Sequence, residues 1–407
     1  MAQIRPFQAW RPKKGFEARI AALPYDVFTL EEARSEVERE PLSFLAIDRP
    51  ETVAEPGEDI YEKAGRLLQE RIDSGYFVQD DLPGVYIYEL TVRGRSQTGI
   101  GALTLVDDYL SGTICRHENT RADKEADRVC HVQACRAQTG PIFLAYRAKE
   151  EIGSIVRACK EEREPVCDFA EQDGVRHRLW CVQEADRTKA LCNAFADVSR
   201  FYIADGHHRC SAAVTCALQE REKKPGYTGE EPWNFILSVL FPDDELKIMD
   251  YNRVVKDLNG LAPATLLARI KDRFTVEEVG KQAVLPDRKG CFGMYMQGCW
   301  YRLVSKERNE DPVEGLDVSV LQEQLLAPLL GILKPRTDER ICFVGGIRGI
   351  AELERLADGY GGVAFDLYPT SMEELFAVAD AGRLMPPKST WFEPKLRSGL
   401  MLHSLLQ

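Results

Sequence analysis

The stretch "YIADGHHRCSAA", residues 202–213, joins an apolar segment to a helix-like segment through an Asp-Gly pair. Apolar side chains before the pair are typical of a buried strand, which we predict to end at Asp205. Gly206 permits a tight turn here, because glycine has no side chain to restrict its backbone. A helix is predicted to follow, from about residue 208 to residue 224. The stretch therefore predicts a strand, a turn and a helix that starts with imidazole and guanidinium groups.

The start of this predicted helix offers several groups that can bind an anion. Backbone N–H groups from Gly206 onward and the helix dipole favour negative charge there. Arg209 can bind phosphate oxygens with its forked guanidinium, and His207 and His208 can donate to phosphate or transfer protons. Asp205 can hold a hydroxyl, a metal ion or an imidazole. We expect a phosphate or carboxylate site; the alternative is a helix capped by Asp205, with the histidines satisfied locally.

A second charged cluster lies in "CRHENTRADKEADR", residues 115–128. Arg116 and His117 are candidates for phosphate binding, and Glu118 is the candidate ligand of Mg²⁺. A glutamate beside phosphate-binding groups often holds Mg²⁺, which bridges phosphate oxygens during phosphoryl transfer. Thr120 is predicted to cap the helix that follows. The alternative is that Arg116, His117 and Glu118 have no functional role.

The helix after Thr120 carries basic and acidic residues in alternation. Arg121, Lys124 and Arg128 fall on one helical face by their spacing. Acidic residues lie between them in the sequence. Such alternation is typical of a solvated helix surface, and we expect the three basic side chains to be exposed.

Two further segments are candidates for ligand contact. In "AALPYDVF", residues 21–28, Asp26 follows a Pro-Tyr pair in a constrained loop and is a candidate for accepting a proton. An ordinary Asx turn is the alternative for Asp26. In "PPKSTWFEPK", residues 386–395, Lys388 and Lys395 flank two aromatic residues. These lysines either close over an anionic ligand or lie on the surface.

The pattern of elements predicts an α+β fold with mixed sheets and flanking helices. Hairpins are predicted around "RGRSQT", residues 93–98, and over residues 290–305, and helical segments lie between them. A chain of 407 residues exceeds one small core, so two or three subdomains are expected. We place three regions at residues 1–148, 149–260 and 261–407.

Composition narrows the classes of function. The formal net charge of -12 argues against nonspecific nucleic-acid binding, so a nucleic-acid partner is not expected. No apolar run approaches the roughly 18 residues of a membrane span, and the N-terminus lacks the apolar region of a signal peptide. The 12 cysteines form no C-x-x-C pair and are expected to be reduced thiols. We therefore predict a cytoplasmic protein with no membrane partner.

Five motifs occur in a recognisable order: "LPYDVF", "RHENT", "YIADGHHR", "YNRVV" and "MPPKSTWFEPKLRSGL". By these motifs the chain is identified as a member of the family known as domain of unknown function 1015. The resemblance spans nearly the whole chain, from "IRPFQAW" to "SGLM". Membership in this family names no reaction.

The D-G-H-x-R element is also similar to one in the ParB-like free-serine kinases, and more distantly to the G-x-R-R turn of ParB nucleotidases. This resemblance implies that Gly206–Arg209 line a phosphate cradle, with Asp205 and His208 near the transferred group. "ENTR" at Glu118 is similar to the Glu-Asn metal and phosphate element of ParB. The arginine is one place closer than in that turn, and Glu118 precedes the glycine turn, whereas in ParB the element follows it.

The resemblance implies a ParB-like element and a small-molecule kinase that uses Mg²⁺ and ATP or ADP. The partners would be a nucleotide and a small hydroxyl-bearing substrate, with free L-serine as the preferred acceptor. Asp26 or Asp205 would take the hydroxyl proton, and Glu118 would hold Mg²⁺. The sequence contains no Walker A motif and no kinase glycine-rich loop, so a standard nucleotide-binding fold is not expected.

Two other functions remain open. One is a nucleotide-binding regulator of the ParB-like type without turnover; a basic DNA-binding segment would favour it, and the sequence shows none. The other is a metal-dependent phosphohydrolase with Asp205, His207 and His208 as ligands. Adjacent histidines on a helix point about 100° apart, which suits a single metal ion poorly.

Overall fold

The computed structural model describes residues 2–307 and 309–406, and its contacts divide the chain into two compact units. The first unit holds residues 2–116, 120–246 and 394–406; the second holds residues 117–119 and 247–393. The boundary predicted at residue 148 lies inside the first unit, because strands from both sides of it pair in one sheet. The boundary predicted at residue 260 lies inside the second unit for the same reason.

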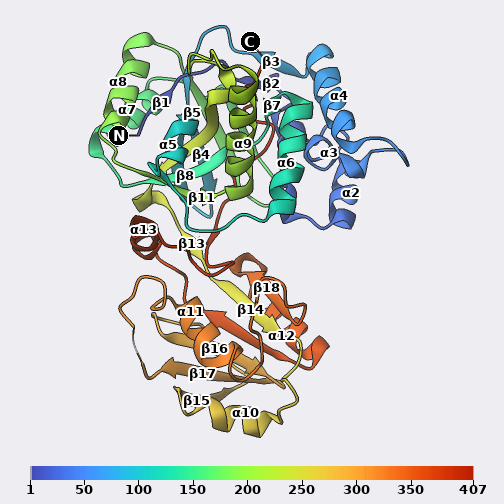
Figure 1. The fold of residues 1–407 in the computed structure, drawn as a ribbon, viewed down its shortest axis with the longest axis vertical. Helices are drawn as coiled ribbons and strands as arrows, with labels where there is room; N and C mark the ends of the chain where they lie inside the picture. Colours follow the sequence, from blue (N-terminus) through green and yellow to red (C-terminus); the bar gives the residue numbers. More distant parts are fainter. Residues whose placement is uncertain (1, 308, 407) are drawn as a thin grey trace. The chain divides into compact units, whose positions relative to one another are not determined.

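The first unit is built on a mixed sheet that has nine strands within the described residues (Figure 1). The strand order is β6-β11-β8-β12-β5-β4-β10-β9, and β1 pairs with β5. Strand β12 runs parallel to β8 and antiparallel to β5. The strands are β1 (Ile4–Arg5), β4 (Val85–Val92), β5 (Arg95–Leu105), β6 (Ile114–Cys115), β8 (Ile142–Tyr146), β9 (Cys167–Ala170), β10 (Arg176–Val182), β11 (Phe201–Asp205) and β12 (Phe235–Pro242).

The predicted hairpin around residues 93–98 is confirmed by strands β4 and β5. The chain turns at Arg93 and Gly94, whose φ angles are 50° and 78°. Two consecutive positive φ angles match the right-handed twist of the two strands, which is why such a two-residue loop closes a hairpin.

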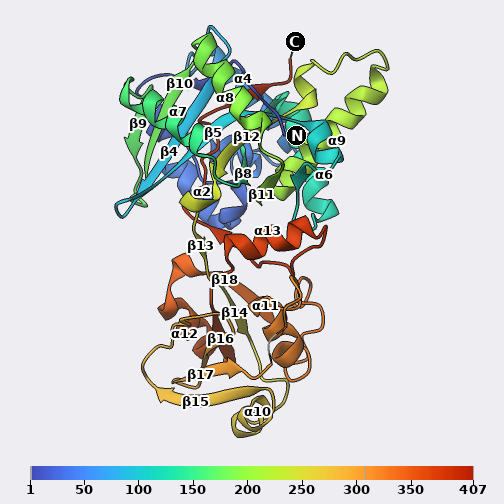
Figure 2. The same ribbon diagram turned by 90° about the vertical axis from the view of Figure 1, so that its left-hand side faces the viewer.

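One face of this sheet is covered by three helices, α7 (Glu150–Glu161), α8 (Ala185–Ala196) and α9 (His207–Lys223). Their apolar side chains pack on sheet residues such as Ile87, Ile100 and Leu144 in one buried core. Figure 2 shows α7 and α8 side by side, apart from α9. The predicted helix after residue 206 is confirmed, although it begins one residue earlier than expected.

A second core of the first unit is formed by N-terminal helices. Thr29 is the N-cap of α2, and its side chain accepts from the backbone N–H of Glu32. Side chains of Phe44, Leu68 and Phe77 fill this core. Its elements are α1 (Glu17–Ile20), α2 (Leu30–Arg39), α3 (Leu45–Asp48), α4 (Ile60–Asp73), α6 (Ala122–Cys135) and the strand pairs β2 (Trp10–Pro12) with β3 (Phe77–Gln79) and β7 (Ala137–Gln138) with β21 (His403–Ser404); the short helix α5 (Val106–Leu110) follows β5.

The last segment of the chain belongs to the first unit. Ala22 and Ser398 exchange backbone hydrogen bonds of 3.2 and 2.8 Å. Arg397 is 1% exposed, and its guanidinium pairs with Glu171 at 3.0 Å and with Asp173. The C-terminal segment is therefore part of the folded core of this unit.

The second unit is built on an antiparallel sheet with six strands in its described part, in the order β15-β17-β16-β19-β14-β18. The predicted hairpin at residues 290–305 is confirmed as β16 and β17. Both units mix helices with mixed or antiparallel sheets, so the predicted α+β class is confirmed. The elements are β13 (Ile248–Met249), β14 (Tyr251–Val255), α10 (Pro263–Ile270), β15 (Phe274–Gly280), β16 (Cys291–Met296), β17 (Cys299–Ser305), α11 (Asp317–Leu321), β18 (Ile341–Gly345), α12 (Ile350–Tyr360), β19 (Val363–Leu367), α13 (Met372–Asp380) and β20 (Trp391–Phe392).

Across residues 2–307 and 309–406, we find no helix with the length and apolar character needed to cross a membrane.

A buried carboxyl group marks the sheet of the second unit. Asp366 on β19 is 2% exposed. Burial, together with the neighbouring Asp250, raises the pKa of Asp366 to about 8, and Asn252 opposes the rise. Two carboxyl groups this close cannot both ionise easily, so the pair keeps a proton at neutral pH.

We predict that the second unit loses stability as the pH rises, because the pair then releases this proton. The folded-state pKa lies above the value of about 3.9 for an unfolded chain, so the contribution is complete below pH 4 and is lost as the pH approaches 8. Asp366→Asn mimics the protonated form and should raise the free energy of unfolding at pH 8–9 by about 1 kcal/mol or more. Calorimetry between pH 5 and pH 9 measures this, with Asp272→Asn at an exposed position as the control. An unchanged pH slope in Asp366→Asn would contradict the prediction.

Candidate phosphate-binding site

The turn between β11 and α9 leads directly into a long helix. Gly206 has φ of 90°, a left-handed conformation that glycine adopts without strain. Cys210 makes the first bond of the helix by donating to the carbonyl of Gly206 at 2.9 Å. Within the described residues, no side chain caps this start, and the first turn holds no acidic residue. The alternative of a helix capped by Asp205 is therefore wrong, and the start is suited to an anion.

Asp205 lies between two cations at this turn. One carboxylate oxygen accepts from Lys395 Nζ at 3.1 Å, and the other accepts from Arg209 Nη2 at 3.2 Å. Burial alone would raise the pKa of Asp205, but Lys395 and Arg209 outweigh burial and hold this pKa below its ordinary value. Asp205 is therefore ionised at neutral pH, and the three groups together carry a net positive charge.

Two glycines make room for the side chain of Arg209. Arg209 Nη1 also donates to the carbonyl of Pro141 at 3.0 Å. A Cβ at Gly140 would lie 2.9 Å from Arg209 Nη1 and 2.9 Å from Ser398 Oγ, and a Cβ at Gly206 would lie 3.2 Å from Arg209 Nη2. The guanidinium is thus fixed beneath the turn by Asp205, Pro141 and the close backbone.

His208 is engaged by the start of α6. Its Nε2 accepts from the backbone N–H of Arg121 at 3.1 Å. A neutral imidazole that accepts at Nε2 carries its proton on Nδ1, so this bond fixes the tautomer. His208 can then donate to a ligand only through Nδ1. His207 is the first residue of α9.

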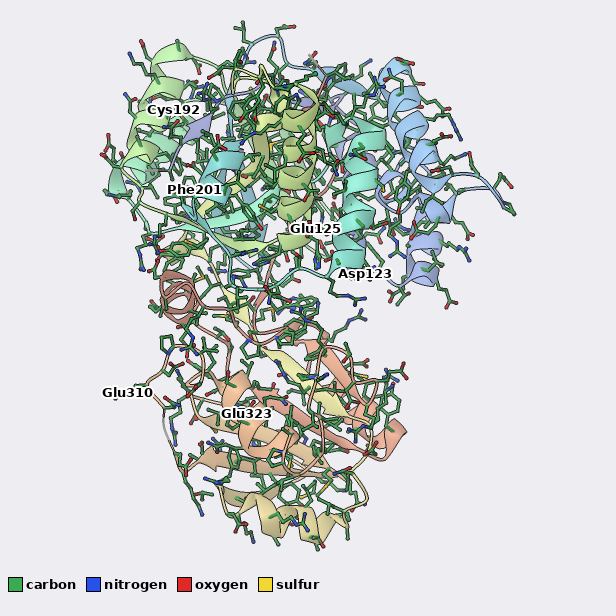
Figure 3. The ribbon with its side chains drawn as sticks, viewed as in Figure 1. Asp123, Glu125, Cys192, Phe201, Glu310 and Glu323 are labelled. Carbon is green, nitrogen blue, oxygen red and sulfur yellow. The ribbon has the colours of Figure 1, made fainter. Side chains whose placement is uncertain are left out.

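Glu125 lies beside the start of α9, although the charge pattern of the sequence did not single it out. It lies on α6 next to α9, as Figure 3 shows, and accepts from Thr120 and from Thr215, each at 3.0 Å. Burial acts to raise the pKa of Glu125, but bonds from Ser211 and the two threonines lower it overall. Thr120 was predicted to cap α6; instead the cap position is Arg121, and the Thr120 hydroxyl donates to Glu125. Nothing in the alternation of charges could separate Glu125 from its exposed neighbours.

Arg116 contacts the ring of Tyr109, which lies beside α9. Its guanidinium carbon lies 5.9 Å from the centroid of the Tyr109 ring. Burial raises the pKa of Tyr109, and Arg116 and Ser211 beside the phenol oppose the rise. Since Ser211 is in the second turn of α9, the structure brings Arg116 to the same region of the first unit as Asp205 and Arg209.

Asp26 lies in a short 3-10 turn, Tyr25–Val27, and its side chain is exposed. It belongs to the first unit, and the neighbouring Tyr25 lines a small cavity together with Arg209. The structure thus places the turn that carries Asp26 beside the residue that anchors the helix start.

His117 and Glu118 belong to the second unit. His117 is 2% exposed, and its Nε2 hydrogen-bonds with Thr390 Oγ1 at 3.3 Å. Glu118 Oε1 lies 3.9 Å from Arg336 Nη2, and Arg336 also donates to the carbonyl of Asn119 at 3.4 Å. The proposed Mg²⁺ ligand thus faces a guanidinium, which the sequence analysis did not anticipate.

Glu118 offers the hard oxygen donors that Mg²⁺ prefers, so its chemistry fits the ion, with Arg336 as a competing cation. In the described ranges 2–307 and 309–406, no three His, Cys, Asp or Glu side chains gather as a metal-binding group. Mg²⁺ usually needs only one or two protein carboxylates, because water and phosphate oxygens complete its shell.

The fold and the turn define an α+β protein in which a glycine turn joins a strand to a long helix. The chain belongs to the family described as protein of unknown function (DUF1015), whose model matches residues 4–319, and the membership predicted from the motifs is confirmed.

Among solved structures, the chain is similar to a mutant of free serine kinase in complex with AMP, with 13% identity, 74% of this chain and 92% of that chain covered, and a TM-score of 0.38. It is also similar to a conserved hypothetical protein from Pyrococcus furiosus (14% identity, 74% and 94% covered, TM-score 0.36). A third is SbnI with C-terminal truncation from Staphylococcus aureus (14% identity, 75% and 88% covered, TM-score 0.38). No curated protein matches the chain.

The packing around Arg209 predicts that position 140 tolerates only glycine. Gly140→Ala would force its Cβ against Arg209 and Ser398, and overpacking of this kind costs about 1–3 kcal/mol of folding free energy. Gly226→Ala, where a Cβ meets open space, is the control and should change stability little. Adding Ser398→Ala to Gly140→Ala should restore part of the loss, because it removes one of the two contacts. Denaturant titration measures the stability of wild type and of these three variants. Equal stability of Gly140→Ala and Gly226→Ala would contradict the packing argument.

Proposed function

We propose that the chain is a small-molecule kinase that transfers a phosphoryl group from ATP or ADP to the hydroxyl of free L-serine. The observation that carries the proposal is the start of α9, which no side chain caps within the described residues and beneath which Asp205 and Pro141 hold Arg209. Backbone N–H groups at a helix start, the helix dipole and a fixed guanidinium stabilise the charge of a phosphate. L-serine as the acceptor rests on the resemblance of the D-G-H-x-R element.

The proposal gives the turn residues distinct roles. The backbone of Gly206 and His207 and the side chains of Arg209 and Arg116 bind phosphate oxygens. His208 donates from Nδ1 toward the transferred group, since its Nε2 is occupied by Arg121. The serine oxygen forms a new bond to phosphorus, the bond from phosphorus to the leaving nucleotide oxygen breaks, and the hydroxyl proton passes to a carboxylate.

Asp26 suits the role of proton acceptor better than Asp205. Both oxygens of Asp205 already accept from cations, and its lowered pKa makes it a weak base. Asp26 is exposed and lies on the turn next to Tyr25. We therefore assign proton transfer to Asp26, and to Asp205 the task of holding Arg209 and Lys395.

The proposal also assigns roles to His117 and Glu118 of the "RHENT" motif. Glu118 would hold Mg²⁺, which when bound neutralises part of the phosphate charge. His117 would bind phosphate. Arg336 compensates the Glu118 carboxylate in the structure and would exchange with the ion.

A nucleotide-binding regulator without turnover is the second candidate. The observation that favours it is the engagement of Asp205, because a carboxylate held by two cations binds and orients but accepts a proton poorly. The two candidates share the phosphate site and differ only in whether Asp26 supports turnover.

The first prediction from the proposal separates binding from turnover. Arg209→Ala should weaken ADP binding by roughly 1.5–3 kcal/mol, about 10- to 150-fold, because a charge-assisted hydrogen bond is lost. Asp26→Asn should lower phosphoserine formation by about 10²–10⁴-fold while ADP affinity is largely kept. Calorimetric titration measures affinity, and mass spectrometry measures O-phosphoserine after incubation with L-serine, Mg²⁺ and ATP or ADP.

Arg187→Ala, which breaks an exposed ion pair on α8, is the control for both measurements. Wild-type protein that binds ADP but forms no O-phosphoserine with either donor would favour the regulator. Unaltered ADP affinity in Arg209→Ala would contradict the phosphate site itself.

A further prediction concerns Mg²⁺. Glu118→Gln keeps the shape of the side chain and removes the charge that the ion requires. Activity should fall at low Mg²⁺ and recover partly as the Mg²⁺ concentration is raised. The rate is measured at several Mg²⁺ concentrations, with Glu150→Gln at an exposed position of α7 as the control. Full activity of Glu118→Gln at low Mg²⁺ would assign Glu118 a structural role.

A further inference from the structure

A small buried cavity lies beneath the phosphate turn in the first unit. Its volume is about 20 Å³, and its walls include Arg209, Tyr25, Arg128 and Asp48. A cavity of this size holds about one water molecule, or one oxygen atom of a ligand. Two guanidinium groups therefore meet in a space that admits a single oxygen.

Arg128 is not the exposed residue that the charge alternation predicts. It is 6% exposed, whereas Arg121 and Lys124 of the same helical face are exposed as expected. Arg128 Nε donates to Asp127 at 2.8 Å, and its Nη1 donates to the carbonyl of Asp48 at 3.3 Å. A buried arginine held at two points is fixed in orientation, because each bond constrains the planar fork.

The fixed guanidinium of Arg128 stacks on the ring of Tyr25. Its central carbon lies 4.0 Å from the ring centroid, well within the range of a cation–π contact. Burial raises the pKa of the Tyr25 phenol, and Arg128 and Arg209 both act against that rise. Tyr25 is therefore an electrostatic neighbour of both arginines.

The backbone that carries Tyr25 is held by another arginine. Arg49 Nη1 donates to the carbonyl of Tyr25 at 3.1 Å and to the carbonyl of Phe28 at 3.0 Å. These two carbonyls stand on either side of Asp26 in the chain. The turn of Asp26 is thus fixed through its backbone by Arg49 and through the Tyr25 ring by Arg128.

We infer that Arg128 is a positioning residue for the phosphoryl-transfer site: through the ring of Tyr25 it holds the turn of Asp26 against the cavity that Arg209 shares. This inference rests on the proposed function. A proton acceptor must lie within hydrogen-bond reach of the hydroxyl, and a displacement of about 1 Å can lower the rate about 10²-fold. Arg128 touches no reacting group, so it should act on turnover and not on phosphate affinity.

The test compares Arg128→Lys and Tyr25→Leu with wild-type protein. Lysine keeps the charge but lacks the planar group that stacks and bonds at two points. Both variants should lower the kcat of phosphoserine formation by about 10- to 100-fold. Their Kd for ADP should stay within about threefold of wild type. Tyr25→Phe, which keeps the ring, should retain more activity than Tyr25→Leu, and Arg157→Lys, at an exposed ion pair on α7, is the matched control.

Hydrogen exchange provides a readout that does not need turnover. Val27 N–H donates to the carbonyl of Pro24 at 3.1 Å, so exchange in a peptide that covers residues 21–30 reports on the turn. Arg128→Lys and Tyr25→Leu should each raise exchange there, whereas Arg157→Lys should not. If wild type forms no phosphoserine, the proposed kinase function fails, and the exchange data alone decide whether Arg128 holds the turn.

Three outcomes would overturn the inference. The first is unchanged exchange at residues 21–30 in both Arg128→Lys and Tyr25→Leu. The second is full kcat in both variants, when wild type is active. The third is an equal loss of ADP affinity and kcat in Arg128→Lys, which would make Arg128 a ligand-binding residue. Should Arg128→Lys fail to fold, Tyr25→Leu and Tyr25→Phe carry the same comparison.

Discussion

The pairing of one carboxylate, Asp205, with Lys395 and Arg209 is the interaction on which the candidate site depends. It joins the end of β11, the first turn of α9 and the C-terminal segment. Without the carboxylate, the two cations would repel each other at a partly buried turn. With it, the positive charge is fixed before any ligand arrives. A site organised in advance avoids the loss of side-chain entropy on binding, which is why such fixed charges stabilise phosphate effectively.

The same pairing makes the environments of two aspartates different. Asp205 has a lowered pKa because cations surround it, and this environment suits a group that stays ionised. Asp26 is exposed on a turn that Arg49 and Arg128 hold from two sides. Residue type alone could not separate these two carboxylates in the sequence. Their environments separate them, because one faces cations and the other faces solvent.

Local features of the fold could be predicted from the sequence, and distant contacts could not. The hairpin turn at Arg93 and Gly94 and the start of α9 depend on neighbouring residues, so turn signals and periodicity were sufficient. Lys395 meets Asp205 across 190 residues, and no periodic pattern encodes such a contact. Arg128 has the spacing of an exposed residue, yet it is buried, with its guanidinium against the Tyr25 ring and the Asp48 carbonyl. Spacing gives the face of a helix, whereas only tertiary packing decides what covers that face.

Three of the named motifs lie at or near the places where the chain passes from one unit to the other. The chain leaves or re-enters the first unit at three places, between residues 116 and 120, after residue 246 and before residue 394. "RHENT" spans the first of these places, "YNRVV" closely follows the second, and the C-terminal motif spans the third. Lys395 is therefore the second residue after the last return, and the ion pair with Asp205 forms only when that return is made. The positive charge of this turn thus depends on the C-terminal segment, because Lys395 follows the second unit in the sequence.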